Sequence, residues 1–205
     1  MAEKLATSTA LFPRRDGLST ARLRLFDEAV RQFGERGYHG VSVRNITDAL
    51  GQKPGSIYAH VASKQQLLFE LSRIGHAEHR DRLRAALLES GSDPVEQITA
   101  IVRAHVLVHL EYPALARVAN LESHHLDRNQ IEAVLAVRSE SELTVFDIIE
   151  RGRRLGEFTV DDPYLATTAI GAMGIRVIEW WTPDSPRSAQ QVADTYAEFA
   201  VKLLR

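Results

Sequence analysis

The sequence predicts an all-α protein of about nine helices, and three observations support this fold class. Apolar residues recur every three or four positions from Ala21 onward, which is the period of an amphipathic helix. Helix start signals recur along the chain, each a serine or aspartate followed by a proline or, three positions on, by glutamine or glutamate. No segment alternates apolar and polar residues as a half-buried strand does.

The first helices follow a polar N-terminal stretch. Residues 1–18 lack helical periodicity and are expected to form a flexible arm. A helix is predicted from Ala21 to Arg36, and Gly37 is a suitable stop. A shorter helix is predicted from Val43 to Leu50, with Ser42 as its N-cap. The apolar face of the first helix consists of Leu25, Phe26, Ala29, Val30 and Phe33.

Six more helices are predicted downstream, each with its own start. A long helix begins at Ser63, which has the capping-box spacing to Gln66. Asp93 precedes a proline at the first helical position, and Pro113 starts a short helix that reaches toward Leu121. The last three are predicted over Asp127–Arg154, Asp162–Trp181 and Ser188–Leu204.

Composition narrows the class of protein. The hydrophobic fraction of 44% and the charged fraction of 25% are ordinary for a globular chain. The sequence contains no cysteine, which excludes disulfides and thiolate metal sites. This composition favours the reducing cytoplasm as the location of the protein. The first twenty residues do not resemble a signal peptide, and no run approaches the ~18 apolar residues of a membrane span, so no membrane partner is expected.

Charge is distributed unevenly along the chain. Residues 1–64 carry ten Lys and Arg against six Asp and Glu, whereas residues 65–205 carry fifteen against twenty-one. The first part is therefore +4 and the second −6, which together give the net charge of −2. A basic head on an acidic body indicates a phosphate-bearing partner at one end, although random scatter of charges is the simpler alternative.

The segment QKPGSIYAHVASK, residues 52–64, contains a helix too short to be stable alone. Pro54 suits a first helical turn, and Gly55 leaves the tip open to a close approach. Ile57 and Val61, four apart, would hold the helix by packing inward. A helix, a turn at Gly51 and such a second helix form a helix-turn-helix, which places the second helix in a DNA major groove. The alternative is a tight corner in a helical bundle.

Residues Phe26–Leu68 closely resemble the DNA-binding domain of TetR-family transcriptional regulators. The matching marks are Phe33 with Gly37-Tyr38, Val43 with Ile46, and Gly51, and they continue in Gly55-Ser56-Ile57-Tyr58 and Ser63-Lys64 with Leu67-Leu68. The sequence departs from the family pattern at Gln52, Pro54, Ala59 and Val61. The resemblance implies a helix-turn-helix domain over residues 19–64 and a ligand-binding and dimerisation domain over residues 65–205.

The resemblance also implies roles for individual residues at the DNA. Four residues are expected to contact phosphates: Thr47, Tyr58, His60 and Lys64. Four are expected to face bases, with Arg44 as the candidate for guanine: Arg44, Lys53, Pro54 and Ser56. Arg14 and Arg15 are candidates for the minor groove or the backbone.

The last two predicted helices are strongly apolar and include Gly171-Ala172-Met173-Gly174, where helices could pack closely. In the family such helices form a four-helix homodimer interface, and a symmetric dimer would bind a palindromic operator. Packing within one chain is the alternative.

The effector is predicted less specifically. Arg138 and Glu142 fall on the stripe of Ile131, Leu135, Val145 and Ile149, so they are either an internal ion pair or an anchor for an anionic ligand. Arg176 with Trp180-Trp181 resembles the branch of the family that responds to acyl-coenzyme A thioesters of lipid, sterol or aromatic catabolism. The alternative effector is a neutral aromatic or drug-like inducer of efflux control.

His105 and His109 are further candidates for ligand contact. Their i, i+4 spacing also suits a metal, but no third ligand is obvious, so no metal site and no cofactor are predicted. Enzyme motifs such as the P-loop, GxGxxG, HExxH and GxSxG are missing, so the chain is not predicted to be an enzyme. A helical enzyme without a recognisable motif remains the alternative from another class.

Overall fold

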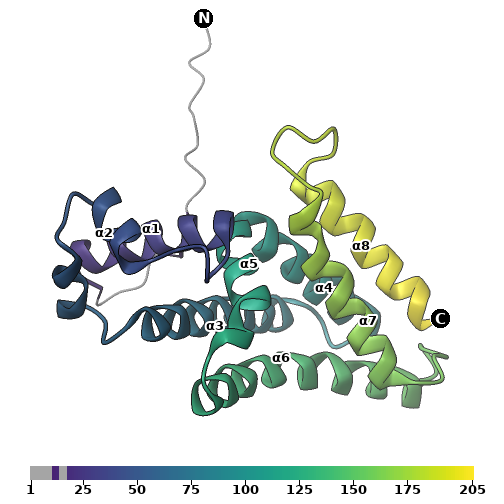
Figure 1. Cartoon of the computed structure of the whole chain (residues 1–205). Coiled ribbons are helices and arrows are strands. Elements are labelled where there is room, and N and C mark those ends of the chain that lie inside the picture. Colours follow the sequence, from purple (N-terminus) through teal and green to yellow (C-terminus); the bar gives the residue numbers. More distant parts are fainter. Residues whose placement is uncertain (1–10, 14–17) are drawn as a thin grey trace, which may run out of the picture.

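The computed structural model describes residues 11–13 and 18–205, and within these ranges every regular element is a helix (Figure 1). The α-helices are α1 (Thr20–Arg36), α2 (Val43–Ala49), α3 (Lys64–Glu89), α4 (Pro94–Glu111), α5 (Pro113–Leu121), α6 (Arg128–Leu155), α7 (Pro163–Ile175) and α8 (Ala189–Leu204). Three short 3-10 helices are η1 (Pro54–Ala59), η2 (Ser123–His125) and η3 (Arg176–Glu179). The all-α prediction is confirmed.

The start signals seen in the sequence act as caps. The Ser63 side chain accepts a hydrogen bond from the backbone N–H of Gln66, and Asp93 accepts from two N–H groups of α4. Ser188 and Gln191 form a reciprocal capping box at the start of α8. These side chains satisfy backbone donors that a helix start otherwise leaves unpaired, which is why local sequence located each start.

Two predicted helices differ in detail. The segment expected to be helical from Asp162 to Trp181 leaves the α-conformation at Ile175 and continues as η3 only to Glu179. The indole N–H of Trp181 donates to the carbonyl of Arg187, which draws the chain into the loop before α8. The short helix of the helix-turn-helix, η1, is 3-10 rather than α, because its N–H groups bond three residues back, as in Ser56 to Lys53.

A first core joins the N-terminal helices to the body. Phe26, Phe33 and Ile46 are fully buried with Ile57 of η1 and Leu68 of α3. Part of the segment expected to be a flexible arm also packs here, because Phe12 contacts the Phe26 ring edge-on at a centroid distance of 5.8 Å. The same core continues into the body through Tyr112, Leu115, Val118 and Leu126.

Helix α3 runs from the N-terminal helices into the body, as Figure 1 shows. A second core surrounds α4, which packs on α3, α6, α7 and α8. The helices α7 and α8 lie at the end of the molecule opposite α2 (Figure 1). None of the helices in the described ranges has the length and apolar character needed to cross a membrane.

The small residues of α7 permit close packing within the chain. Gly174 is buried, and a Cβ atom at this position would overlap the imidazole of His105 on α4. The prediction that this glycine run serves contacts between subunits is therefore wrong for Gly174. A Cβ on Gly171, three residues earlier, would have no neighbour within 4 Å among the described residues.

These two glycines make a matched test of the α4–α7 contact. Gly174→Ala should lower the free energy of unfolding by about 1–3 kcal/mol, because the methyl group displaces His105 from its hydrogen bonds to His79 and the Gly171 carbonyl. Gly171→Ala should leave stability unchanged or raise it by up to ~1 kcal/mol, because alanine restricts the unfolded chain without a clash. Urea denaturation measures both, and equal losses would contradict the packing described here.

Candidate functional site

The turn and η1 present a small polar surface at the end of the N-terminal helices. Ile57 and Val61 are buried and anchor the segment, as the sequence predicts. Lys53, Pro54 and Tyr58 are exposed, and the phenol of Tyr58 is 59% accessible. A Cβ on Gly55 would meet no neighbour within 4 Å among the described residues, so a partner can approach the backbone closely there.

Polar groups on both sides of the turn are available to that partner. The Arg44 side chain on α2 is 79% exposed and lies 3.4 Å from the Asp48 carboxylate, a contact that is weak at this exposure. The Ser56 hydroxyl lies within hydrogen-bonding distance of the Gln52 side chain and the Lys53 carbonyl. His60 is half-buried at the end of η1.

Two predicted phosphate contacts are not on this surface. Thr47 is fully buried, and its hydroxyl lies 3.2 Å from the carbonyls of Val43 and Arg44 in its own helix. The Lys64 ammonium donates to the carbonyl of Tyr38 at 2.6 Å and lies 3.9 Å from the centre of that ring. Burial also lowers the pKa of Lys64. The polar groups of both side chains are therefore already bonded within the chain.

Arg14 and Arg15, the candidates for a minor-groove contact, lie outside the described residues.

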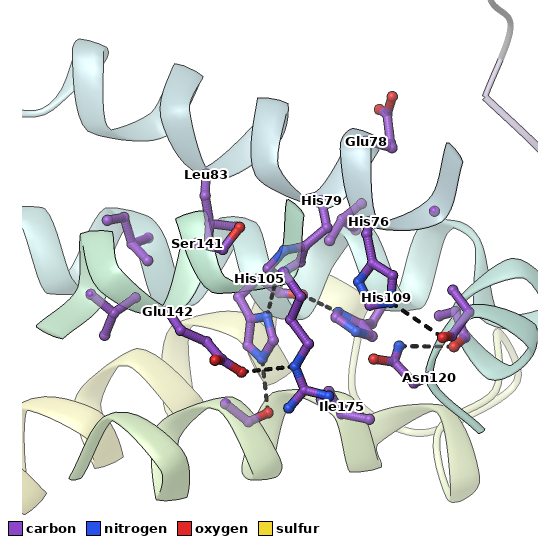
Figure 2. Close-up of a pocket in the computed structure, with 18 of the residues that line it drawn as sticks. His76, Glu78, His79, Leu83, His105, His109, Asn120, Ser141, Glu142 and Ile175 are labelled. Carbon is purple, nitrogen blue, oxygen red and sulfur yellow. Dashed lines mark hydrogen bonds and ion pairs between the residues drawn. The ribbon is translucent and has the colours of Figure 1, made fainter. Parts of the chain in front are cut away.

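A cavity lies in the body, walled by α3, α4, α5, α6 and α7 (Figure 2). The space it encloses together with its open mouth is about 840 Å³. Most of its wall is apolar, with Leu83, Val102, Leu115 and Ile170 among the lining residues. Because α3 also carries the N-terminal core, the cavity lies beside the helix that joins the two parts of the chain.

Four of the polar residues in the cavity wall are histidines. His76 and His79 come from α3, and His105 and His109 from α4. The Nε2 atom of His79 lies 2.7 Å from Nδ1 of His105, and Nε2 of His105 donates to the Gly171 carbonyl at 3.1 Å. His109 donates from Nδ1 to the carbonyl of His105, and His76 donates from Nε2 to the carbonyl of Ala119.

These imidazoles are neutral near pH 7. Burial lowers the pKa of His76 and of His105 to about 4, and that of His109 to about 3. Burial, followed by the neighbouring His105 and His109, also brings the pKa of His79 well below its ordinary value. Removing a cation from water in an apolar cavity is costly, so the uncharged form is favoured.

Arg138 and Glu142 form the ion pair that was one of the two alternatives for them. They form an i, i+4 ion pair of 2.7 Å on α6, and both line the cavity. The expectation that they lie on a buried stripe is wrong, because their side chains are 43% and 51% exposed and Leu135 beside them is also exposed. Among the described residues that line the cavity, Arg138 is the one arginine or lysine.

The structure does not bring Arg176 and Trp180 to this cavity. The Arg176 side chain is 66% exposed and pairs with Glu179. Trp180 is 51% exposed and stacks on Tyr196 of α8 at a centroid distance of 6.5 Å. Ile175, where α7 ends, is the last residue of this segment to line the cavity.

The cavity also contains residues that sequence reasoning did not assign. His79 supplies a third imidazole beside His105 and His109, although 26 residues separate it from His105. Ser141 is buried, and its hydroxyl has no hydrogen-bond partner among the described residues. The spacing of His76 and His79 was visible in the sequence, but nothing local indicates which helix faces α4.

The N-terminal helices are fastened to the body close to the cavity. The Glu122 carboxylate accepts a hydrogen bond of 2.9 Å from the backbone N–H of Tyr38. The Gln65 side chain donates to the carbonyl of His125 at 3.2 Å. Where α3 crosses α5, a Cβ on Gly75 would come within 2.8 Å of the Ala119 methyl group, so the two helices already touch.

The outer faces of α7 and α8 are apolar and exposed. Tyr164 and Leu165 on α7 are 69% and 61% accessible, and Phe199 and Leu203 lie one turn apart on α8. The opposite face of α8, with Ala193, Ala197 and Ala200, is already buried inside the chain.

Two family models cover most of the chain. The model described as bacterial regulatory proteins of the tetR family matches residues 25–71, and a tetracyclin repressor-like C-terminal domain matches residues 91–204. The HTH-type transcriptional repressor KstR2 of Mycobacterium tuberculosis is 26% identical over 181 residues, which cover 87% of this chain and 90% of that protein.

Solved structures share the fold. A bacterial regulatory protein in the tetR family from Rhodococcus RHA1 superposes with a TM-score of 0.85 at 28% identity, covering 91% of this chain and 98% of that one. AibR, crystallised in complex with isovaleryl coenzyme A and operator DNA, superposes with a TM-score of 0.80 at 20% identity, covering 87% and 96%.

Proposed function

The chain belongs to the TetR family of bacterial transcriptional regulators, and from this premise we propose that it is a homodimeric repressor that an acyl-coenzyme A thioester releases from a palindromic operator. The observation that carries the effector proposal is an apolar cavity with a single arginine at its wall, beside the helix that bears the DNA-binding head. As a DNA-binding regulator it would act in the cytoplasm, without catalysis.

The exposed surface around η1 supports the DNA contact. Arg44, Lys53, Pro54 and Ser56 face outward or lie at the surface of the turn, where bases would be reached. Tyr58 and His60 border that surface and suit phosphate oxygens. A two-fold dimer would hold two such surfaces ~34–36 Å apart, one turn of DNA.

The cavity supports an acyl-coenzyme A effector through two features. Its apolar wall suits an acyl chain, and Arg138 is partly exposed, so the guanidinium can exchange Glu142 for a phosphate or carboxylate of the ligand. The unpaired hydroxyl of Ser141 is a donor for a carbonyl oxygen. AibR was crystallised with isovaleryl coenzyme A, which favours this class over a neutral drug-like inducer.

The exposed apolar faces of α7 and α8 support the dimer. Large apolar side chains that recur along one helix face are unfavourable in water unless a partner covers them. Two such helices from each subunit would form a four-helix interface, which is the usual arrangement in this family.

The DNA contact is tested by paired substitutions. Arg44→Ala should weaken binding to an operator selected from random duplexes by about 1–3 kcal/mol, with a smaller effect on random DNA. Tyr58→Phe should weaken both by the same factor, because phosphates carry no sequence information. Arg154→Ala, which removes an exposed charge at the far end of α6, is the control and should change neither. Equal losses on both DNAs for Arg44→Ala would remove it from base recognition.

The effector is tested by titrating acyl-coenzyme A thioesters of increasing chain length into the protein–operator complex. Arg138→Met should raise the thioester concentration for half-release about tenfold or more, because a charge-assisted hydrogen bond is lost. Stability should fall by less than ~1 kcal/mol, since the ion pair with Glu142 is half-exposed.

Two outcomes separate the alternatives. If Arg138→Met/Glu142→Leu responds to thioesters as the native chain does, the ion pair is structural and Arg138 is not the anion contact. If neutral aromatic compounds release the native protein and no thioester does, the acyl-coenzyme A proposal fails and the drug-like inducer takes its place.

The dimer is tested on α8. Phe199→Glu/Leu203→Glu should give a monomer in sedimentation velocity and abolish binding to the palindrome, because two charges would be buried between subunits. Leu88→Glu changes a still more exposed leucine at the end of α3, 78% accessible against 48% for Phe199 and 44% for Leu203, and should leave the dimer intact. A double variant that sediments as the native protein does would place the interface elsewhere.

A further inference from the structure

Three imidazoles from two helices meet in the wall of the cavity, and the proposed function does not use them as a group. His79 lies on α3, and His105 and His109 lie one turn apart on α4. One ring nitrogen of each lies within 4.8 Å of those of the other two, and Figure 2 shows the rings gathered in one place. Within the described ranges, no other group of three or more histidines or carboxylates has this geometry.

The spacing of the rings suits a tetrahedral metal ion. Zinc binds imidazole nitrogens at ~2.0–2.1 Å, which places the centres of its ligand rings roughly 5 Å apart. The ring centres here are 4.9 Å apart for His79 and His105, 5.5 Å for His79 and His109, and 4.7 Å for His105 and His109. Side-chain rotations would have to bring the three nitrogens, which already lie within 4.8 Å of one another, to ligand positions.

The outer hydrogen bonds already fix which nitrogens carry lone pairs. His105 donates from Nε2 to the Gly171 carbonyl, so its Nδ1 has the free lone pair. His109 donates from Nδ1 to the His105 carbonyl, so its Nε2 has the free lone pair. Metal-bound histidines almost always donate their other N–H to a carbonyl or carboxylate in this way. Two of the three rings are therefore held in the tautomer and orientation that a metal requires.

His79 completes the group through one proton shift. Because Nδ1 of His105 is an acceptor, Nε2 of His79 donates in the 2.7 Å hydrogen bond between them. A metal ion would take the place of that proton, which would move to Nδ1 of His79 without leaving the residue. The ring would remain neutral, as a metal ligand must be.

The charged groups at the cavity wall also bear on a bound metal ion. The Arg138 guanidinium opposes a second cation, but the Glu142 carboxylate beside it lines the same cavity. An anionic fourth ligand would reduce the remaining charge.

We propose that His79, His105 and His109 bind one divalent transition-metal ion of the zinc class, with the fourth coordination position open to the cavity. Three imidazoles without thiolates suit zinc, and a site with three protein ligands leaves one position for water or a ligand oxygen. The ion would fasten α3 to α4 and offer a contact to a carbonyl or carboxylate of the effector. That second role rests on the proposed function of the cavity, whereas the metal site itself does not.

The test measures metal binding to the untagged full-length chain after removal of metal by a chelator. Calorimetry with zinc should give one ion per chain, and cobalt should give the visible absorption of a tetrahedral complex. His79→Gln should weaken zinc by more than the roughly 10–100-fold that follows from losing an outer hydrogen-bond partner. His109→Gln provides an independent second variant, and circular dichroism verifies that both remain folded.

Two other histidines are the matched controls. His76 lines the same cavity, but its ring bonds only to the Ala119 carbonyl, so His76→Gln is the first control. His125 lies against the rings of His39 and His124, away from the cavity, so His125→Gln is the second. Both should bind zinc as the native chain does. The proposal is overturned if the native chain binds no more zinc than His79→Gln does, or if His125→Gln alone abolishes binding.

A release assay keeps this proposal distinct from the effector proposal. If the protein binds zinc but no thioester releases it from DNA, the metal-site proposal holds and the acyl-coenzyme A proposal fails. Release by thioesters from a chain that binds no zinc would do the reverse. If both bind, zinc should lower the thioester concentration for half-release, and an unchanged value would remove the ion from effector binding.

Discussion

The whole arrangement depends on α3 being shared by two packed regions with a cavity between them. Its first turns place Leu67, Leu68 and Leu71 in the N-terminal core with no accessible surface, and Leu83 belongs to the second core. Between these regions, the same helix lines the cavity with Gly75, His76 and His79. Because both ends are fixed in close-packed interiors that deform little, any movement of the middle of α3 must move the N-terminal helices as well.

The polar wall of the cavity is stable because its histidines are neutral and paired. His76, His105 and His109 each donate to a backbone carbonyl, and His79 bonds to His105. Buried polar groups in this state cost little, whereas a single unpaired charge there would cost several kcal/mol. Without a bound metal ion, the inside of the cavity is therefore uncharged, and its ion pair of Arg138 and Glu142 lies near solvent. Such a cavity accepts an apolar body and a few oriented polar contacts.

The sequence predicted the features that depend on residues close together in the chain, such as helix starts and turns. The caps at Ser63, Asp93 and Ser188 located helix starts, and the motif around Gly55 identified the helix-turn-helix. Side-chain directions were predicted less well, because they depend on how helices rotate against one another. Thr47 faces the core and Lys64 turns back to Tyr38, which only the packing of the N-terminal helices against one another reveals. His79 joins His105 across 26 residues for the same reason.

The close contact between α3 and α5 at Gly75 determines which helices a bound effector must displace. At this crossing α3 already touches Ala119 of α5, so a ligand that enters between the helices displaces one of them. Movement of α3 carries Lys64 and its bond to Tyr38, and movement of α5 carries Glu122, which holds the N–H of the same Tyr38. Either route reaches the end of α1, beside the helix-turn-helix. A ligand that fits the displaced state better than the other shifts the population away from DNA, and its difference in affinity for the two states sets the size of that shift.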